Sequence, residues 1–270
     1  VCSSDLGAIS GSVGTLSNAG TIEGGSRSAV DWGTEFFAFG DVINSGVIGS
    51  SGSVATLANL SGRALTNTGT VENRGTGAAI AATGGMSILN GTNGRIASGG
   101  AIAIAADDGL SLTNQGTIVG DVVAGSAFGL GSSTIDSTAG RIVGALRLGG
   151  GDDTLVARFD GTQLTYGIDG TIDGGAGTDT IRTAFADDTT LASALALPTD
   201  FERLALAPDF GATVTLANGF AAPGVLLVGG SGTLVNRTTL SGTGQILLDE
   251  FGNGSPSFVN AGAIVSTGGS

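Results

Sequence analysis

The sequence predicts an all-β chain that folds as a parallel β-helix, a solenoid with about 23–24 residues per coil. The first observation is a repeat, because variants of the unit LTNQGTIVG, residues 112–120, return along the chain with nearly constant spacing. Each unit carries one asparagine, and the steps between them are 26, 23, 23 and 24 residues: Asn18, Asn44, Asn67, Asn90 and Asn114. A later pair, Asn236 and Asn260, is 24 residues apart. A fixed period of this length is typical of solenoids, in which each repeat packs only on its neighbours.

The second observation is the alternation within one period. Branched apolar residues two apart, such as Ile102 and Ile104, are separated by small or polar residues, which is the period-2 pattern of strands. Three apolar positions recur one coil later, after 22, 24 and 22 residues: Ile80 with Ile102, Ile88 with Leu112, and Ile96 with Ile118. Three short strands and three turns fit one period, and roughly ten coils fit the chain. A leucine-rich repeat has a similar period, but its leucine-spaced consensus is missing.

The residues of the unit have separate predicted roles. Leu112 and Ile118 are expected to point inward and to stack on their counterparts in adjacent coils. Asn114 precedes a tight corner, where its amide can bond to the backbone or to the asparagine of the next coil, about 4.8 Å away. Gly116 is expected to take a corner conformation that is closed to residues with a Cβ. These roles favour a structural rather than a ligand-binding interpretation of the repeated asparagines.

Composition and charge exclude several functions. The chain has 51 glycines, a mean hydropathy of +0.35 and no run of 18 apolar residues, so no membrane span is predicted. The net charge of −13 comes from 23 acids and 10 arginines, with no lysine or histidine, which argues against a basic nucleic-acid-binding face. Cys2 is the only cysteine, so neither a disulfide framework nor a cysteine metal cluster is predicted. Residues 1–6 do not fit the repeat and are interpreted as a fragment edge or an assembly scar.

The repeats resemble a known family. L-T-N-x-G-T-I units, interleaved with segments such as GAAIAAT (residues 77–83) and GAIAIAA (residues 100–106), look like the passenger region of bacterial autotransporter proteins. GGGDDTLV (residues 149–156), DGGAGTDTI (residues 173–181) and FERLAL (residues 201–206) look like segments of the same passengers. The resemblance implies a single-stranded, right-handed parallel β-helix that is exported through the outer membrane and tethered by a C-terminal β-barrel. This chain would be an internal piece of such a protein.

In chain order, residues 7–148 are expected to form regular coils with an insertion at residues 31–40, residues 149–210 less regular Gly/Asp-rich coils, and residues 211–270 further coils. The insertion holds four aromatic residues: Trp32, Phe36, Phe37 and Phe39. An exposed patch for a glycan or host surface is one interpretation, and a cap over the open end of the core is the other, which we favour. In residues 187–208, the spacing from Leu191 to Leu197 predicts one or two helical turns that begin at Asp188 or Thr189 and stop at Pro198.

Two aspartates raise the question of calcium. GGAGTDTIR (residues 174–182) matches the calcium-binding nonapeptide of RTX proteins in full, whereas LGGGDDTLV (residues 148–156) lacks its first glycine. The aligned residues Asp153 and Asp179 are 26 residues apart, not nine or eighteen as in tandem nonapeptides. Gly-Asp corners between ordinary coils are therefore the favoured interpretation. We predict no metal site and no cofactor.

Catalysis is also disfavoured, although parallel β-helices carry polysaccharide-cleaving enzymes. Without histidine or lysine, a Ser-His-Asp triad and a Schiff base are excluded. The remaining candidates for a glycosidase pair are adjacent acids: Asp107 and Asp108, Asp152 and Asp153, and Asp187 and Asp188. The missing residues thus favour a non-enzymatic role, and the resemblance to autotransporter passengers implies a structural or adhesive stalk on the surface of a Gram-negative bacterium, with a host or matrix glycan or protein, or a neighbouring cell, as its partner. The alternatives are a carbohydrate-active β-helix and an RTX-like calcium-binding segment.

Overall fold

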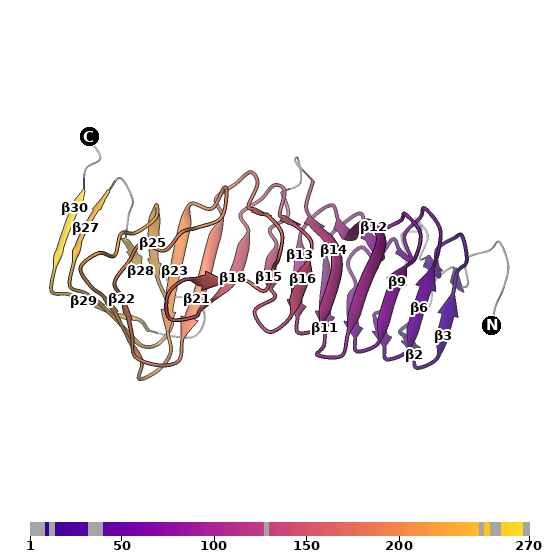
Figure 1. Cartoon of the computed structure of the whole chain (residues 1–270), viewed down its shortest axis with the longest axis horizontal. Helices are drawn as coiled ribbons and strands as arrows, with labels where there is room; N and C mark the ends of the chain where they lie inside the picture. The colour runs from indigo at the N-terminus through magenta and orange to yellow at the C-terminus, as the bar shows by residue number, and fades with distance from the viewer. Residues whose placement is uncertain are drawn as a thin grey trace. The chain divides into compact units, whose positions relative to one another are not determined.

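The computed structural model describes residues 9–10, 14–31, 40–126, 130–242, 246–248 and 255–266. The regular elements of these residues are all strands, and parallel strands stack into a β-solenoid of about ten turns (Figure 1). The predicted fold class is therefore confirmed. Among the described residues there is no helix with the length and apolar character needed to cross a membrane. Residues 1–6 and the aromatic residues of the insertion, 32–39, lie outside the described part of the chain.

The described chain divides into two compact units. Unit 1 takes in the described residues up to Asp153 together with Gly167–Gly177, and unit 2 takes in Thr154–Tyr166 together with those from Thr178 onward.

Within unit 1, parallel strands stack in three columns. Column 1 contains β2 (Leu16–Asn18), β5 (Val42–Asn44), β8 (Ala64–Asn67), β11 (Met86–Asn90), β13 (Leu110–Asn114) and β15 (Thr134–Asp136). Column 2 contains β3 (Thr21–Glu23), β6 (Val47–Ser50), β9 (Thr70–Asn73), β12 (Arg95–Ala106), β14 (Thr117–Ala124) and β16 (Arg141–Val143). Column 3 contains β1 (Ile9–Ser10), β4 (Val30–Asp31), β7 (Leu57–Ala58), β10 (Ile80–Ala82), the second halves of β12 and β14, β17 (Leu146–Arg147) and β20 (Ile172–Asp173). One coil thus contributes one strand segment to each column, as the period-2 pattern predicts.

The register of unit 1 matches the sequence period with one correction. Ile88 pairs with Leu112, and Ile96 pairs with Ile118, as predicted. Ile80, however, pairs with Ile104 rather than Ile102. The ladder between β12 and β14 is irregular on both sides of Ile102, which pairs with Asp121 and is 37% exposed. This irregularity turns Ile102 outward and leaves Ile104, which is fully buried, as the core residue of the coil.

Unit 2 has its own columns. One contains β18 (Thr154–Phe159), β21 (Thr180–Phe185), β23 (Arg203–Pro208), β25 (Val225–Val228) and β28 (Ile246–Leu248). A second contains β22 (Thr189–Leu191), β24 (Thr213–Leu216), β26 (Thr233–Asn236) and β29 (Ser257–Asn260). Strands β27 (Thr239–Gly242) and β30 (Ala263–Ser266) pair with each other, and β19 (Leu164–Thr165) pairs antiparallel with β18.

The helical turns predicted between Leu191 and Leu197 are wrong. Leu191 instead ends strand β22, which pairs in parallel register with β24, and residues 192–198 form no helix. The Leu and Ala spacing resembles a helical face because inward positions also recur here, with Leu191 and Leu195 buried. Pairing with the next coil decides that this segment is a strand, and the local spacing of Leu and Ala contains no information about that pairing.

Candidate functional site

A ladder of buried amides runs through column 1 of unit 1. The Nδ2 of each asparagine donates a 2.8 Å hydrogen bond to the side-chain oxygen of its counterpart in the next coil: Asn18 to Asn44, Asn44 to Asn67, Asn67 to Asn90, Asn90 to Asn114, and Asn114 to Ser137. All six side chains are at least 93% buried. The amides also bond to backbone carbonyls, as Asn44 does to Thr70 O at 3.0 Å. Both bonding modes predicted for the repeated asparagine are therefore present, and the ladder is structural.

The glycine of the repeat has a different role from the one predicted. Gly116 is not among the residues with positive φ, so the expected corner conformation is wrong. Its lack of a side chain is nevertheless required, because a Cβ there would lie against the carbonyl oxygens of Gly94 and Gly91 and near Asn90 Nδ2. The close approach of the preceding coil, rather than backbone strain, excludes larger residues. At Gly20, the same position of the first described unit, a Cβ would meet open space.

The Gly/Asp-rich segments of unit 1 form corners. Gly149, Gly151, Gly175 and Gly177 all have φ between +86° and +142°, a region that favours glycine. Asp173 Oδ1 accepts a hydrogen bond from Gly175 N at 3.1 Å and so shapes the second corner. The Gly-Asp segments thus have the local geometry of corners between coils.

Asp153 and Asp179, the aligned aspartates of the two segments that resemble calcium-binding nonapeptides, are both buried at the starts of strands. Asp153 directly precedes β18, is 1% exposed and accepts a short hydrogen bond from Ser133 N. Asp179 directly precedes β21 and is 0% exposed, and its backbone N–H donates to Glu202 Oε2 at 2.8 Å. Among the described residues, no group of three or more acids or cysteines comes together in a way that could hold a metal ion.

The adjacent acid pairs lie in different settings. Asp107 and Asp108 are exposed in unit 1, and Asp152 is exposed beside the buried Asp153. In unit 2, Asp187 and Asp188 are exposed, and Asp188 Oδ1 accepts a 2.7 Å hydrogen bond from Thr213 N. Asp188 thus caps the backbone of a neighbouring coil, as Asp153 also does.

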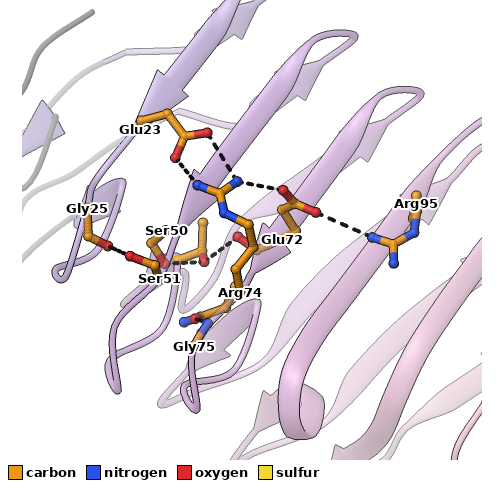
Figure 2. A network of polar contacts seen from close by, with 10 residues as sticks. Glu23, Gly25, Ser50, Ser51, Glu72, Arg74, Gly75 and Arg95 are labelled. Carbon is orange, nitrogen blue, oxygen red and sulfur yellow. Dashed lines mark hydrogen bonds and ion pairs between the residues drawn. The ribbon is translucent and has the colours of Figure 1, made fainter.

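Arginines link carboxylates across coils on the outer face of column 2 (Figure 2). The guanidinium of Arg74 contacts Glu23 and Glu72, each at 2.6 Å, and Arg95 lies 3.6 Å from Glu72. The hydrogen bond to Glu23, followed in size by that to Glu72, raises the pKa of Arg74, so the guanidinium stays protonated. Gly49 of the intervening coil makes room, because a Cβ there would lie 2.8 Å from Glu23 Oε1 and 3.0 Å from Arg74 Nη1.

A second such contact involves Asp121. Its pKa is lowered, first by the hydrogen bond from Ala145 N and also by Arg147, whose Nη1 lies 2.8 Å from Asp121 Oδ2. Arg141 and Asp169 form a third contact at 2.6 Å. These exposed pairs join neighbouring coils of unit 1, and each is expected to contribute little to stability on its own.

A groove of about 440 Å³ lies at the corner that leads into column 1. It crosses successive coils of unit 1, from Asp41 to Ser132. Three glycines of its lining occupy one register position in adjacent coils, since Gly62 N donates to Gly85 O at 2.6 Å and Met86 N donates to Gly109 O at 3.3 Å. At Gly62 a Cβ would meet open space, whereas at Gly85 and Gly109 it would lie 3.0 Å from Asp108 O and 2.9 Å from Ser132 O, so these two glycines allow close contact between coils beside the hollow.

Charged side chains flank this hollow. Asp41, Arg63 and Asp108 come from three different coils, and all line the groove. Asp41 Oδ1 accepts a 3.0 Å hydrogen bond from Ala64 N, which orients its exposed carboxylate. The carboxylate of Asp108 lies against Gly131 of the following coil. Of the acid pairs considered from the sequence, only Asp108 takes part in this site.

Sequence reasoning missed Asp41 and Arg63, although a signal was present. Gly62, Gly85 and Gly109 recur after 23 and 24 residues, in step with the asparagines, and this spacing places Arg63 and Asp108, which are next to two of these glycines, at the same corner of the solenoid. Comparison of the chain with protein-family models, with curated proteins and with solved structures finds no match. The function is therefore argued from the chain's own residues.

Proposed function

We propose that the chain is a structural and adhesive segment of a protein on the surface of a Gram-negative bacterium, the role implied by its resemblance to autotransporter passengers. The observation that supports this proposal is the buried amide ladder of unit 1, which joins one coil to the next from Asn18 to Ser137. Buried side chains that bond to their own coil and to the neighbouring coils hold the stack together and leave the outer faces for contacts with other molecules.

The outer faces suit an extracellular setting. Exposed carboxylates and arginines join the coils, and the net charge of −13 favours solubility. A catalytic role is disfavoured by the composition, because acids are the only general bases that the chain offers besides its single tyrosine and cysteine. We therefore propose that the segment supports and presents surfaces and does not catalyse a reaction.

Protease accessibility tests the proposed location. In the bacterium that encodes the chain, an antibody against this segment is expected to label intact cells, and proteinase K added to intact cells is expected to remove the signal. A periplasmic protein probed in the same samples is the control and stays intact. A signal that disappears only after the outer membrane is permeabilised would show that the surface location is wrong.

A further inference from the structure

We propose that the groove of unit 1, lined by Asp41, Arg63, Asp108 and the hydroxyls of Ser87 and Ser111, binds an extended neutral oligosaccharide that lies across the strands. The inference rests on the adhesive part of the proposed function and gives it a site and a ligand class. The groove volume of about 440 Å³ is in the range of sites that hold small ligands.

The direction of the groove selects an elongated ligand with a repeating chemical group. The groove crosses the coils, and its lining residues therefore recur every strand spacing of about 4.8 Å. Ser87 and Ser111 are partners in the ladder between β11 and β13, and both are exposed. Two hydroxyls one strand apart, repeated along a groove that crosses several coils, can bond to equivalent groups on successive units of a polymer.

The backbone around the groove argues against a peptide. A peptide that adds to a sheet needs an edge strand with unpaired N–H and C=O groups. Strands β8, β11 and β13 are each paired on both sides, as interior strands of column 1. A peptide lying across these strands would find no such edge, so main-chain recognition of a peptide is disfavoured.

Charge argues against a polyanion. Two carboxylates, Asp41 and Asp108, stand in different coils of the groove around one arginine, Arg63, and the whole chain carries −13. An acidic polymer would be repelled on approach. A neutral sugar has hydroxyls that can donate to the two carboxylates and to the serine oxygens and can accept from the guanidinium, without adding charge to the groove.

The Asp41 carboxylate is held in place before any ligand arrives. Its Oδ1 accepts a 3.0 Å hydrogen bond from the backbone N–H of Ala64 in the next coil. A carboxylate fixed in this way loses little conformational entropy when a ligand binds. At Gly62, where a Cβ would meet open space, the missing side chain lets a sugar ring approach the backbone closely.

Titration calorimetry of the purified chain with neutral hexasaccharides tests the proposal, with β-1,4-linked glucose, N-acetylglucosamine and mannose as the probes. At least one probe is expected to bind, and a hexagalacturonate of the same length is expected to bind at least about tenfold more weakly, a difference of about 1.4 kcal/mol. Absence of binding by all three neutral probes, or tighter binding of the galacturonate, would overturn the proposal.

A matched pair of variants locates the site. Ser111→Arg fills the groove from an exposed position of β13, whereas Thr113→Arg places the same side chain two residues along the same outward face, outside the groove. Binding is expected to weaken at least about tenfold in Ser111→Arg and to stay within twofold in Thr113→Arg. Equal effects of the two variants, with both folded by circular dichroism, would show that the sugar binds elsewhere. If no sugar binds but intact cells are labelled by the antibody, the structural role on the surface stands without the sugar site. If a sugar binds but intact cells are not labelled, only the surface location is wrong.

Discussion

The inward positions of the main strand columns differ between the two units. In column 1 of unit 1, each strand carries an apolar residue and then, two positions later, a buried amide or hydroxyl, as in Leu112 and Asn114. In the unit 2 column of β18, β21, β23 and β25, the paired positions are Leu155 and Ala157, Ile181 and Thr183, Leu204 and Leu206, and Leu226 and Val228. The polar ladder of unit 1 is thus replaced by an almost wholly apolar column.

Coil length varies more in unit 2. In unit 1, the steps from Leu16 to Val42, Leu65, Ile88, Leu112 and Ile135 are 26, 23, 23, 24 and 23 residues. In unit 2, the steps from Leu155 to Ile181, Leu204, Leu226 and Ile246 are 26, 23, 22 and 20 residues. A buried amide must meet the next amide at hydrogen-bond distance, whereas an apolar column is non-directional. The comparison indicates that the amides fix which residues pair between coils, even across the 26-residue coil of unit 1, and that apolar burial alone fixes this pairing less tightly.

The largest expected effect comes from interrupting the ladder at its centre. Asn67→Leu leaves the Asn44 amide and the Asn90 oxygen without their ladder partners in the interior, which is expected to cost about 3 kcal/mol of unfolding free energy. Asn236→Leu in unit 2 affects one ladder partner, Asn260, and is expected to cost about 1 kcal/mol. Urea denaturation followed by circular dichroism compares the two. Equal costs would contradict the special role of the unit 1 ladder.

A somewhat smaller effect is expected at the glycine of the repeat. Gly116→Ala places a Cβ against Gly94 O, so the coils must move apart, at a cost of about 1–3 kcal/mol. Gly20→Ala makes the same change where a Cβ has open space. The melting temperature of this variant is expected to stay within about one degree of that of the parent protein. If both variants melted alike, close coil contact would not be the reason for this glycine.

In unit 2, an effect on stability smaller than those at Asn67 and Gly116 is expected at alkaline pH, from Tyr166. Burial raises the pKa of Tyr166 to about 12, and its hydroxyl makes no hydrogen bond within the described residues. Because the folded pKa lies above the unfolded value of 10, the stability that the buried neutral phenol contributes is complete below pH 10 and is lost as the pH rises toward 12. Tyr166→Phe is expected to reduce the loss of stability between pH 10 and 12, measured by urea midpoints, with little change at pH 7. An unaltered alkaline profile would contradict the burial of the phenol.

The smallest effect is expected on the outer face of unit 1. Arg74→Gln removes the contacts with Glu23 and Glu72 and is expected to cost under about 1 kcal/mol at low salt. The difference should disappear in about 1 M salt, where charges are screened within about 3 Å. Arg27→Gln, at an exposed arginine outside the ion pairs of the described residues, is the control. A cost for Arg74→Gln that persists in high salt would show that packing, not charge, is lost.

The sequence predicted the parts of the fold that depend on repetition. The asparagine spacing gave the coil period, and the bond from Asn67 to Asn90 follows from it. The outward turn of Ile102 and the strand at Leu191 could not be predicted, because both depend on pairing with the next coil rather than on local pattern. The groove was missed for a related reason: Asp41 and Arg63 are single charged residues, and only stacking brings them beside the glycine column.

The central claim is that the amides act as one connected ladder, and a double-mutant cycle at Asn67 and Asn90 tests it most directly. Asn67→Leu leaves Asn44 and Asn90 each without one ladder partner, and Asn90→Leu does the same to Asn67 and Asn114. In the double variant, only Asn44 and Asn114 remain as asparagines that have lost a ladder partner. Its cost in urea denaturation is therefore expected to be about 3 kcal/mol, close to that of either single variant. A cost near the sum of the two, about 6 kcal/mol, would show independent contributions and would contradict the ladder as the device that fixes coil register.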